Sequence, residues 1–253
     1  MTAKDFGPIE NDYAFFMAHA TEAETDQAHY CRELTDFAVG RRTLRMLDFG
    51  CGAGDFSVGL MSALNWPVEV LELTLFEPVQ HQRETAARRL AGFSSSPIRS
   101  WETLPADRGP LFDLILSNHV LYYVEELAAT LSQMRDLLAP GGKLLLAIAG
   151  WDNVLNQLWQ TGFALLGRPV PYYVADDVAA ILSQQRASFR VSQVGYQLRF
   201  PDSEENRLKI LRFLFGEFLP EIGPQRLLGE FDGYVRNGYV EIVTHSEHFV
   251  VEG

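Results

Sequence analysis

The stretch MLDFGCGAGDFS, residues 46–57, decides the fold of this chain. An apolar run that ends in an acid and leads into three alternating glycines predicts a strand, a tight turn and a helix start. Gly50, Gly52 and Gly54 carry no side chain that would keep the backbone away from a ligand. The helix that follows points unpaired N–H groups into the same space, where a nucleotide-like cofactor could sit. Glycine turns also occur without ligands, so the residues downstream must decide between the two interpretations.

Short apolar runs and helix-compatible segments alternate around this stretch. The runs are bounded by turn residues, as expected of buried strands, and lie at 44–49, 73–76, 111–116 and 143–148. Helix-compatible segments lie at 57–64, 80–91 and 125–138. Strands that alternate with helices form a parallel sheet covered on both faces. The sequence therefore predicts an α/β fold, with a Rossmann-like, doubly wound and mostly parallel sheet.

The two ends of the chain add helical segments to this core. Apolar residues recur at helical spacing over residues 10–38, so residues 1–43 are expected to form an N-terminal helical cap. After an aromatic-rich piece, the pattern predicts a helix at 176–185, a strand at 191–200 and a final strand-rich tail at 239–251. A helical insert at 203–238 precedes the tail and is a candidate lid. No linker is visible, so we expect one domain over residues 1–253.

Composition limits the compartment and the partners. The chain has 253 residues, is 47% hydrophobic and carries a formal net charge of -12. This charge leaves no basic stripe for nucleic acid and suits a neutral or cationic small molecule better. The longest apolar run, 144–148, is too short to cross a membrane, and two cysteines fit a reducing compartment. We expect a cytoplasmic protein, plausibly a monomer, although the sequence leaves the oligomeric state open.

An acid follows the second strand. Glu77 comes at the end of the run Leu75-Phe76-Glu77-Pro78, within reach of a ribose lying over the glycine loop, and a carboxylate there can accept bonds from both ribose hydroxyls. Such an acid serves NAD and S-adenosylmethionine equally well. No GxGxxG register fits the glycines at 50, 52 and 54, which weakens the dinucleotide interpretation.

Four motifs in this order resemble those of class I S-adenosylmethionine-dependent methyltransferases. They are the glycine loop, the segment ending at Glu77, the strand FDLILSNH at 112–119 and the segment LAPGGKL at 138–144, and the resemblance covers about residues 44 to 150. It implies a seven-stranded sheet with S-adenosylmethionine as the cofactor. The residues that it places at this cofactor are Asp48, Gly50, Cys51, Gly52, Glu77, Pro78, Gln82, Trp101, Glu102 and Asn118.

A narrower resemblance extends over most of the chain. The segments FMAHATE at 16–22, LYYV at 121–124, YVADDV at 173–178 and HFVVE at 248–252 are similar in order and spacing to those of the histamine N-methyltransferase family. This resemblance implies that Glu22 binds a substrate amine and that His119 and His245 are polar residues of the acceptor site. The family has amides at these last two places, so two histidines imply a different substrate.

Methyl transfer requires mainly a nucleophile held in line while water is excluded. An ammonium must first lose a proton, which an imidazole can take, so His119 and His245 are the candidate catalytic bases. Rings that could line a cationic site are those of Tyr13, Phe16, Tyr122, Tyr123 and Trp151. No HExxH or similar spacing occurs, so no metal is expected.

The resulting hypothesis is S-adenosylmethionine-dependent methylation of a small-molecule nitrogen nucleophile, an amine or N-heterocycle. Methylation of a hydroxyl or carboxylate oxygen is the first alternative. A nicotinamide-dependent oxidoreductase and a binding protein that keeps the fold without catalysis are more distant ones.

Overall fold

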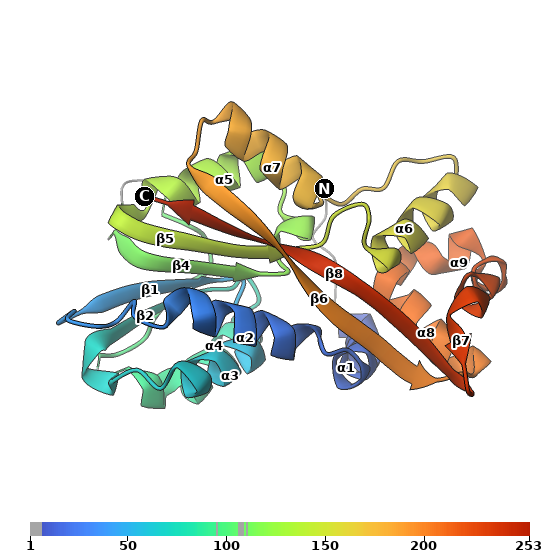
Figure 1. Ribbon diagram of the computed structural model, residues 1–253, viewed down its shortest axis with the longest axis horizontal. Helices are drawn as coiled ribbons and strands as arrows, with labels where there is room; N and C mark the ends of the chain where they lie inside the picture. Colours follow the sequence, from blue (N-terminus) through green and yellow to red (C-terminus); the bar gives the residue numbers. More distant parts are fainter. Residues whose placement is uncertain (1–6, 95, 106–108, 110) are drawn as a thin grey trace.

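In the computed structural model, which describes residues 7–94, 96–105, 109 and 111–253, one sheet runs through the molecule. Among these residues it has eight strands in the order β3-β2-β1-β4-β5-β8-β6, with β7 paired to β8 (Figure 1). The strands are β1 (Leu44–Phe49), β2 (Leu71–Phe76), β3 (Arg99–Trp101), β4 (Phe112–Asn118), β5 (Leu138–Ile148), β6 (Phe189–Pro201), β7 (Val235–Arg236) and β8 (Tyr239–Glu252). Strands β1 to β5 pair in parallel, whereas β8 runs antiparallel to β5 and β6. The predicted fold class is confirmed.

Helices cover both faces of the sheet. They are α1 (Glu10–His19), α2 (Glu22–Leu34), α3 (Asp55–Leu64), α4 (Gln80–Leu90), α5 (Leu127–Asp136), α6 (Val154–Leu165), α7 (Ala175–Gln184), α8 (Glu204–Phe215) and α9 (Leu219–Ile222). In Figure 1, α2, α3 and α4 lie on one side of the strands and α5 and α7 on the other. Side chains of β5 point alternately to the two faces of the sheet and so contribute to two hydrophobic cores. Leu144 and Leu146 pack in one core, and Leu145 and Ala147 pack in the other. No helix among the described residues is long and apolar enough to cross a membrane.

The N-terminal helical stretch is divided at Ala20 and Thr21. Ala20 adopts an extended conformation and forms an isolated bridge with Leu198 of β6. The Thr21 N–H donates to the Gln197 carbonyl at 2.9 Å, and the Gln197 N–H donates to the Thr21 hydroxyl oxygen at 2.9 Å. The start of α2 is therefore attached to the sheet, which fixes the side chains of its first turns against β8 and β4.

Helices α1, α6, α8 and α9 gather at one end of the molecule, beside the long extension of β6 and β8 (Figure 1). The Trp159 indole N–H of α6 donates to the Leu214 carbonyl of α8 at 2.9 Å. Arg212 of α8 pairs with Asp12 of α1 at 3.0 Å. Helix α6 lies inside the aromatic-rich segment, where the sequence predicted no helix, and its buried residues include Trp159 and Phe163.

Candidate active site

The glycine loop turns sharply at the carboxyl end of β1. Gly50, Gly52 and Gly54 have φ of 77°, 53° and 84°, the left-handed region that favours glycine. A Cβ on Gly50 would lie 2.5 Å from the side chain of Val120, so packing also excludes a side chain there. A Cβ on Gly52 would meet only the Gln82 side-chain oxygen, at 3.7 Å. The space above Gly52 is therefore where a ligand can approach the backbone.

Two carboxylates border this loop. Glu77 at the end of β2 is 9% exposed, and it accepts the Val79 N–H at 2.9 Å and the Gly52 N–H at 3.1 Å. Asp48 is buried and accepts a hydrogen bond from the Ser57 hydroxyl. Burial raises the pKa of Asp48 to about 6, with Glu77 adding to the rise and Ser57 opposing it. The loop and Glu77 thus form one hydrogen-bonded unit at the carboxyl edge of the sheet.

The other predicted cofactor residues are spread around this unit. Trp101 packs edge-on against Phe112, with ring centroids 5.7 Å apart, and its carbonyl accepts the Glu77 N–H. The side chain of Glu102 is 74% exposed. The Pro78 carbonyl accepts a hydrogen bond from Arg83 at 3.2 Å. Burial raises the pKa of the Cys51 thiol well above its usual range, so Cys51 is not a reactive thiolate.

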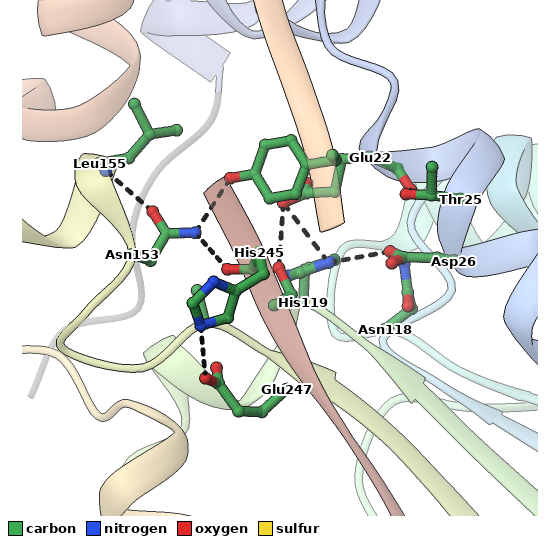
Figure 2. A network of polar contacts seen from close by, with 12 residues as sticks. Glu22, Thr25, Asp26, Asn118, His119, Asn153, Leu155, His245 and Glu247 are labelled. Carbon is green, nitrogen blue, oxygen red and sulfur yellow. Dashed lines mark hydrogen bonds and ion pairs between the residues drawn. The ribbon is translucent and has the colours of Figure 1, made fainter. Parts of the chain in front are cut away.

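Asn118 belongs instead to a second group of polar residues, centred on His119 at the end of β4 (Figure 2). His119 Nε2 lies 3.0 Å from Asp26 Oδ2 and 3.7 Å from Glu22 Oε1. The Asn118 amide donates to Asp26 at 3.4 Å. His119 has a φ of 56°, an uncommon conformation for a residue other than glycine. Such strained positions concentrate at functional sites.

The charges of this group are strongly coupled. Burial lowers the pKa of His119, but the carboxylates of Glu22 and Asp26 outweigh it and raise the pKa to about 9. Burial raises the pKa of Glu22, and the negative charge of Asp26 adds to the rise, whereas the positive charge of His119 opposes it. For Asp26, His119 and His248 outweigh the effect of burial and hold the pKa below its usual range. Neighbouring titratable groups whose pKa values are strongly shifted in opposite directions are typical of an active site.

The predicted aromatic residues fall into different environments. The Tyr122 hydroxyl accepts the Ala149 N–H at 2.6 Å and lies 3.3 Å from His119 Nδ1, so Tyr122 directly contacts the second group. Tyr123 packs edge-on against Tyr172. Phe16 is 3% exposed and stacks on Phe213, so it belongs to the core. Tyr13 also packs against Phe213, and burial, with the charge of Glu22 adding to it, raises its pKa to about 12. Trp151 follows β5, and its backbone N–H donates to Asp176 Oδ2 at 3.1 Å.

His245 lies on the opposite face of β8 from the residues that meet α2. Side chains alternate along this strand, so His245 and Glu247 share one face and Ser246 and His248 the other. His245 Nε2 lies 3.1 Å from Asp152 and 3.3 Å from Glu247. The ligand atoms of these three residues lie within 4.8 Å of one another, a spacing that could hold a cation. The two predicted bases are therefore in separate polar groups.

Sequence reasoning missed Asp26, Ser246 and His248, and also Tyr196, whose hydroxyl hydrogen-bonds to Glu22 and accepts the Asn153 amide N–H at 3.1 Å. Asp26 stands one helical turn after Glu22 and could have been found from that spacing. The Ser246 hydroxyl donates to Glu22 at 3.4 Å, and His248 Nε2 lies 2.8 Å from Asp26 Oδ1. No local pattern connects these β8 residues with α2, because they meet only in the folded chain.

The strand order, the glycine loop and the acid that it binds define a class I S-adenosylmethionine-dependent methyltransferase, whose cofactor is S-adenosylmethionine. The chain belongs to the methyltransferase domain family, whose sequence model matches residues 23–194. The predictions of this family, of an enzyme and of its cofactor are confirmed. The same match sets aside the nicotinamide-dependent alternative.

Individual relatives include both N- and O-methyltransferases. The chain is 29% identical over 238 residues to histamine N-methyltransferase of Xenopus tropicalis, covering 83% of this chain and 80% of the relative. It is also 29% identical over 172 residues to malonyl-[acyl-carrier protein] O-methyltransferase of Erwinia billingiae, covering 67% of this chain and 64% of the relative. The structure of magnesium protoporphyrin IX methyltransferase from Synechocystis, solved with bound S-adenosylhomocysteine, matches with a TM-score of 0.53 at 15% identity, covering 91% of this chain and 83% of that one. That likeness shows the fold.

Proposed function

We propose that this enzyme methylates a nitrogen atom of a small molecule, an amine or N-heterocycle. The observation that carries the proposal is the buried group of Glu22, Asp26 and His119 beside the end of β4. Two carboxylates and one imidazole favour a cationic acceptor, because a buried negative charge requires a partner. The imidazole supplies a site for the proton that an ammonium must lose.

The glycine loop and its acid fit the cofactor. Gly52 leaves room for close approach of a ligand, and Glu77 presents two carboxylate oxygens where a ribose would lie over the loop. In this proposal Glu77 accepts hydrogen bonds from the ribose, while Asp48, Gly50, Cys51 and Gly52 surround the amino-acid part. The adenine side is held by Trp101 and Glu102, Pro78 and Gln82 lie beside Glu77, and Asn118 approaches the cofactor from the group around His119. The bound cofactor supplies an electrophilic methyl group on a positively charged sulfur.

The chain's own residues then control the proton of the acceptor. With a pKa of about 9, His119 holds a proton at neutral pH before an acceptor binds. A cationic acceptor beside Glu22 and Asp26 competes with that proton for the same carboxylates and lowers the pKa of His119. His119 releases that proton to solvent, becomes neutral and can accept the acceptor's proton, while the Tyr122 hydroxyl holds the other ring nitrogen. The role of His245 as a second base is a separate proposal, since it lies with Asp152 and Glu247.

The two helical additions are proposed to close over this site. Residues 1–43 supply α1 and α2, and residues 203–238 supply α8 and α9. Phe16 of α1 stacks on Phe213 of α8 at 4.6 Å, and Asp12 pairs with Arg212. These contacts couple the cap to the insert, so both should respond to ligand together and exclude water from the acceptor.

Oxygen methylation is the second candidate, because one of the matched relatives is an O-methyltransferase. The group around His119 also supports it, since an imidazole next to a carboxylate can deprotonate a hydroxyl.

The test is a panel of primary amines, imidazoles and matching alcohols of the same carbon skeletons, incubated with methyl-labelled S-adenosylmethionine. Mass spectra with fragmentation locate the methyl group. Methylation of nitrogen by the wild type, together with strongly reduced activity of the Glu22→Gln variant, supports the proposal. Label found only on the alcohol oxygens favours the second candidate, oxygen methylation. Calorimetric titration with S-adenosylhomocysteine serves as a control for an intact cofactor site. Methylation of the amines by the Glu22→Gln variant at the normal rate would contradict the role of the carboxylate.

A further inference from the structure

A line of buried hydrogen bonds runs from the start of α6 to Glu22. Asn153, the residue before α6, is fully buried, and its Oδ1 accepts the Leu155 N–H at 2.8 Å (Figure 2). Its Nδ2 donates to the His245 carbonyl at 2.7 Å and to the Tyr196 hydroxyl oxygen at 3.1 Å. The Tyr196 hydroxyl in turn hydrogen-bonds to Glu22. Side chains therefore join the cap of α6 to the candidate acceptor site.

The chemistry of the partners sets the direction of each bond in this line. The Leu155 N–H can only donate and the His245 carbonyl can only accept, so the Asn153 amide has one orientation. Its NH2 group therefore faces the Tyr196 oxygen, which accepts. The Tyr196 proton then points away from Asn153, and Glu22 is the acceptor that it reaches. The line ends on Glu22 with a donor, and a donor favours the ionised carboxylate.

The Tyr196 hydroxyl is not needed to fill the core. Tyr196 of β6 is 5% exposed, and a buried hydroxyl must find partners, whereas a phenylalanine ring would fill the same space without that requirement. The hydroxyl is therefore better explained by the carboxylate that it contacts than by packing.

Glu22 lies among groups with opposing effects on its charge. Burial raises its pKa, His119 opposes the rise, Asp26 adds to it, and the hydroxyls of Tyr196 and Ser246 oppose it. The other titratable side chains that respond to the charge of Glu22 are Tyr13 of α1 and, after β4, Tyr122 and Tyr123. When an acceptor binds and His119 becomes neutral, the Tyr196 hydroxyl still donates to the carboxylate.

We propose that Tyr196 and Asn153 are positioning residues that hold Glu22 ionised and oriented for a cationic acceptor. This inference rests on the proposed role of Glu22 in binding an amine. Asn153 directs the Tyr196 hydroxyl, and Tyr196 donates to the carboxylate, so both residues act through Glu22. A buried carboxylate that stays ionised requires a cationic partner, and the line therefore makes the enzyme select a charged acceptor over a neutral one.

The test measures the pKa of the Glu22 carboxyl by carbon-13 NMR on the full chain saturated with S-adenosylhomocysteine. The Glu22 signal is assigned from its loss in Glu22→Gln. Tyr196→Phe keeps the ring and removes only the hydroxyl, so the pKa should rise by about one to two units, as for one lost hydrogen bond to a charged group. Asn153→Ser keeps an oxygen that caps α6 but removes the amide donor, so it should cause a smaller rise.

The matched control is Tyr239→Phe, which also loses one hydroxyl while its ring stays under Arg199. It should leave the pKa of Glu22 unchanged. With the amine that the acceptor panel identifies, Tyr196→Phe should raise KM about tenfold at neutral pH, with the deficit shrinking at higher pH as Glu22 ionises. The affinity for S-adenosylhomocysteine should remain that of the wild type.

A wild-type pKa of Glu22 in Tyr196→Phe overturns the inference, and a lowered melting temperature with that pKa would show that Tyr196 only stabilises the fold. A wild-type pKa in Asn153→Ser removes Asn153 from the line. Failure of the proposed function gives a different result. In that case no amine is methylated, whereas the NMR titration, which needs no acceptor, still reports whether Tyr196 acts on Glu22.

Discussion

The proton on His119 should make folding stability depend on pH between about 6.5 and 9. Its pKa is raised from 6.5 to about 9 in the folded protein, chiefly by Glu22 and then Asp26 acting against burial. Because the folded pKa lies above the unfolded one, the stabilisation is fully present below pH 6.5. It declines as the pH rises and is absent above pH 9. Replacing His119 by Gln removes this titration while keeping a polar side chain of similar size.

The magnitude follows from the shift. A rise of about 2.5 units corresponds to a net stabilisation of the protonated form by about 3 kcal/mol, at about 1.4 kcal/mol for each unit, which is what remains after burial opposes the carboxylates. The side chain is 17% exposed, so solvent screens this interaction only weakly. In the variant, Glu22 can take up a proton and relieve its repulsion from Asp26, so about 3 kcal/mol is an upper figure.

The assay is urea unfolding of the wild type and His119→Gln at pH values from 6 to 10. The free-energy difference between the two proteins should shrink by about 3 kcal/mol over this range. An exposed-site variant, His81→Gln, should track the wild type at every pH. Parallel curves for wild type and His119→Gln would refute the reasoning, because they would show that His119 holds no extra proton in the folded state.

Three further substitutions test individual contacts. Glu77→Ala should weaken S-adenosylhomocysteine binding by about 1.5–3 kcal/mol in calorimetric titration, as for lost charge-assisted bonds, while Glu69→Ala leaves it unchanged. Gly50→Ala should lower the free energy of unfolding by about 2–4 kcal/mol, since a left-handed backbone and the Val120 side chain both oppose a Cβ; a wild-type melting temperature would contradict this. Phe16→Ala should cost about 3–5 kcal/mol of stability as a core ring, and a stable variant with impaired acceptor binding would instead make it a substrate contact.

Much of the fold was predictable because it depends on local patterns. The strand at 44–49 coincides with β1, and the predicted helix at 176–185 differs from α7 by one residue at each end. Strand β2 begins two residues earlier than predicted, because its first residues are continuous with a preceding 3-10 turn. Helix α6 lies in the aromatic-rich segment, for which the sequence predicted no helix. Its apolar face is packed against α8, which is distant in sequence.

The cofactor side of the site was more predictable than the acceptor side. The loop and Glu77 come from adjacent strands of a repeating pattern, so their neighbourhood follows from topology. The partners of His119 are set by the attachment of α2 to β6 through Thr21 and Gln197, a contact between residues far apart in the chain. Periodicity identified the apolar face of α2 and gave no sign that Asp26 would be buried. A buried acid is recognisable only once its partners are known.

The last prediction concerns which carboxylate sets the proton affinity of His119. Glu22 contributes the larger charge effect on its pKa, yet Asp26 is closer, at 3.0 Å against 3.7 Å. Since the pKa of Glu22 is itself raised, that carboxyl takes up a proton more readily than Asp26, whose lowered pKa keeps it ionised. Nitrogen-15 NMR titration should therefore show a larger fall in the pKa of His119 for Asp26→Asn than for Glu22→Gln. The reverse order would mean that Glu22 is fully ionised in the resting site and sets the proton affinity of His119.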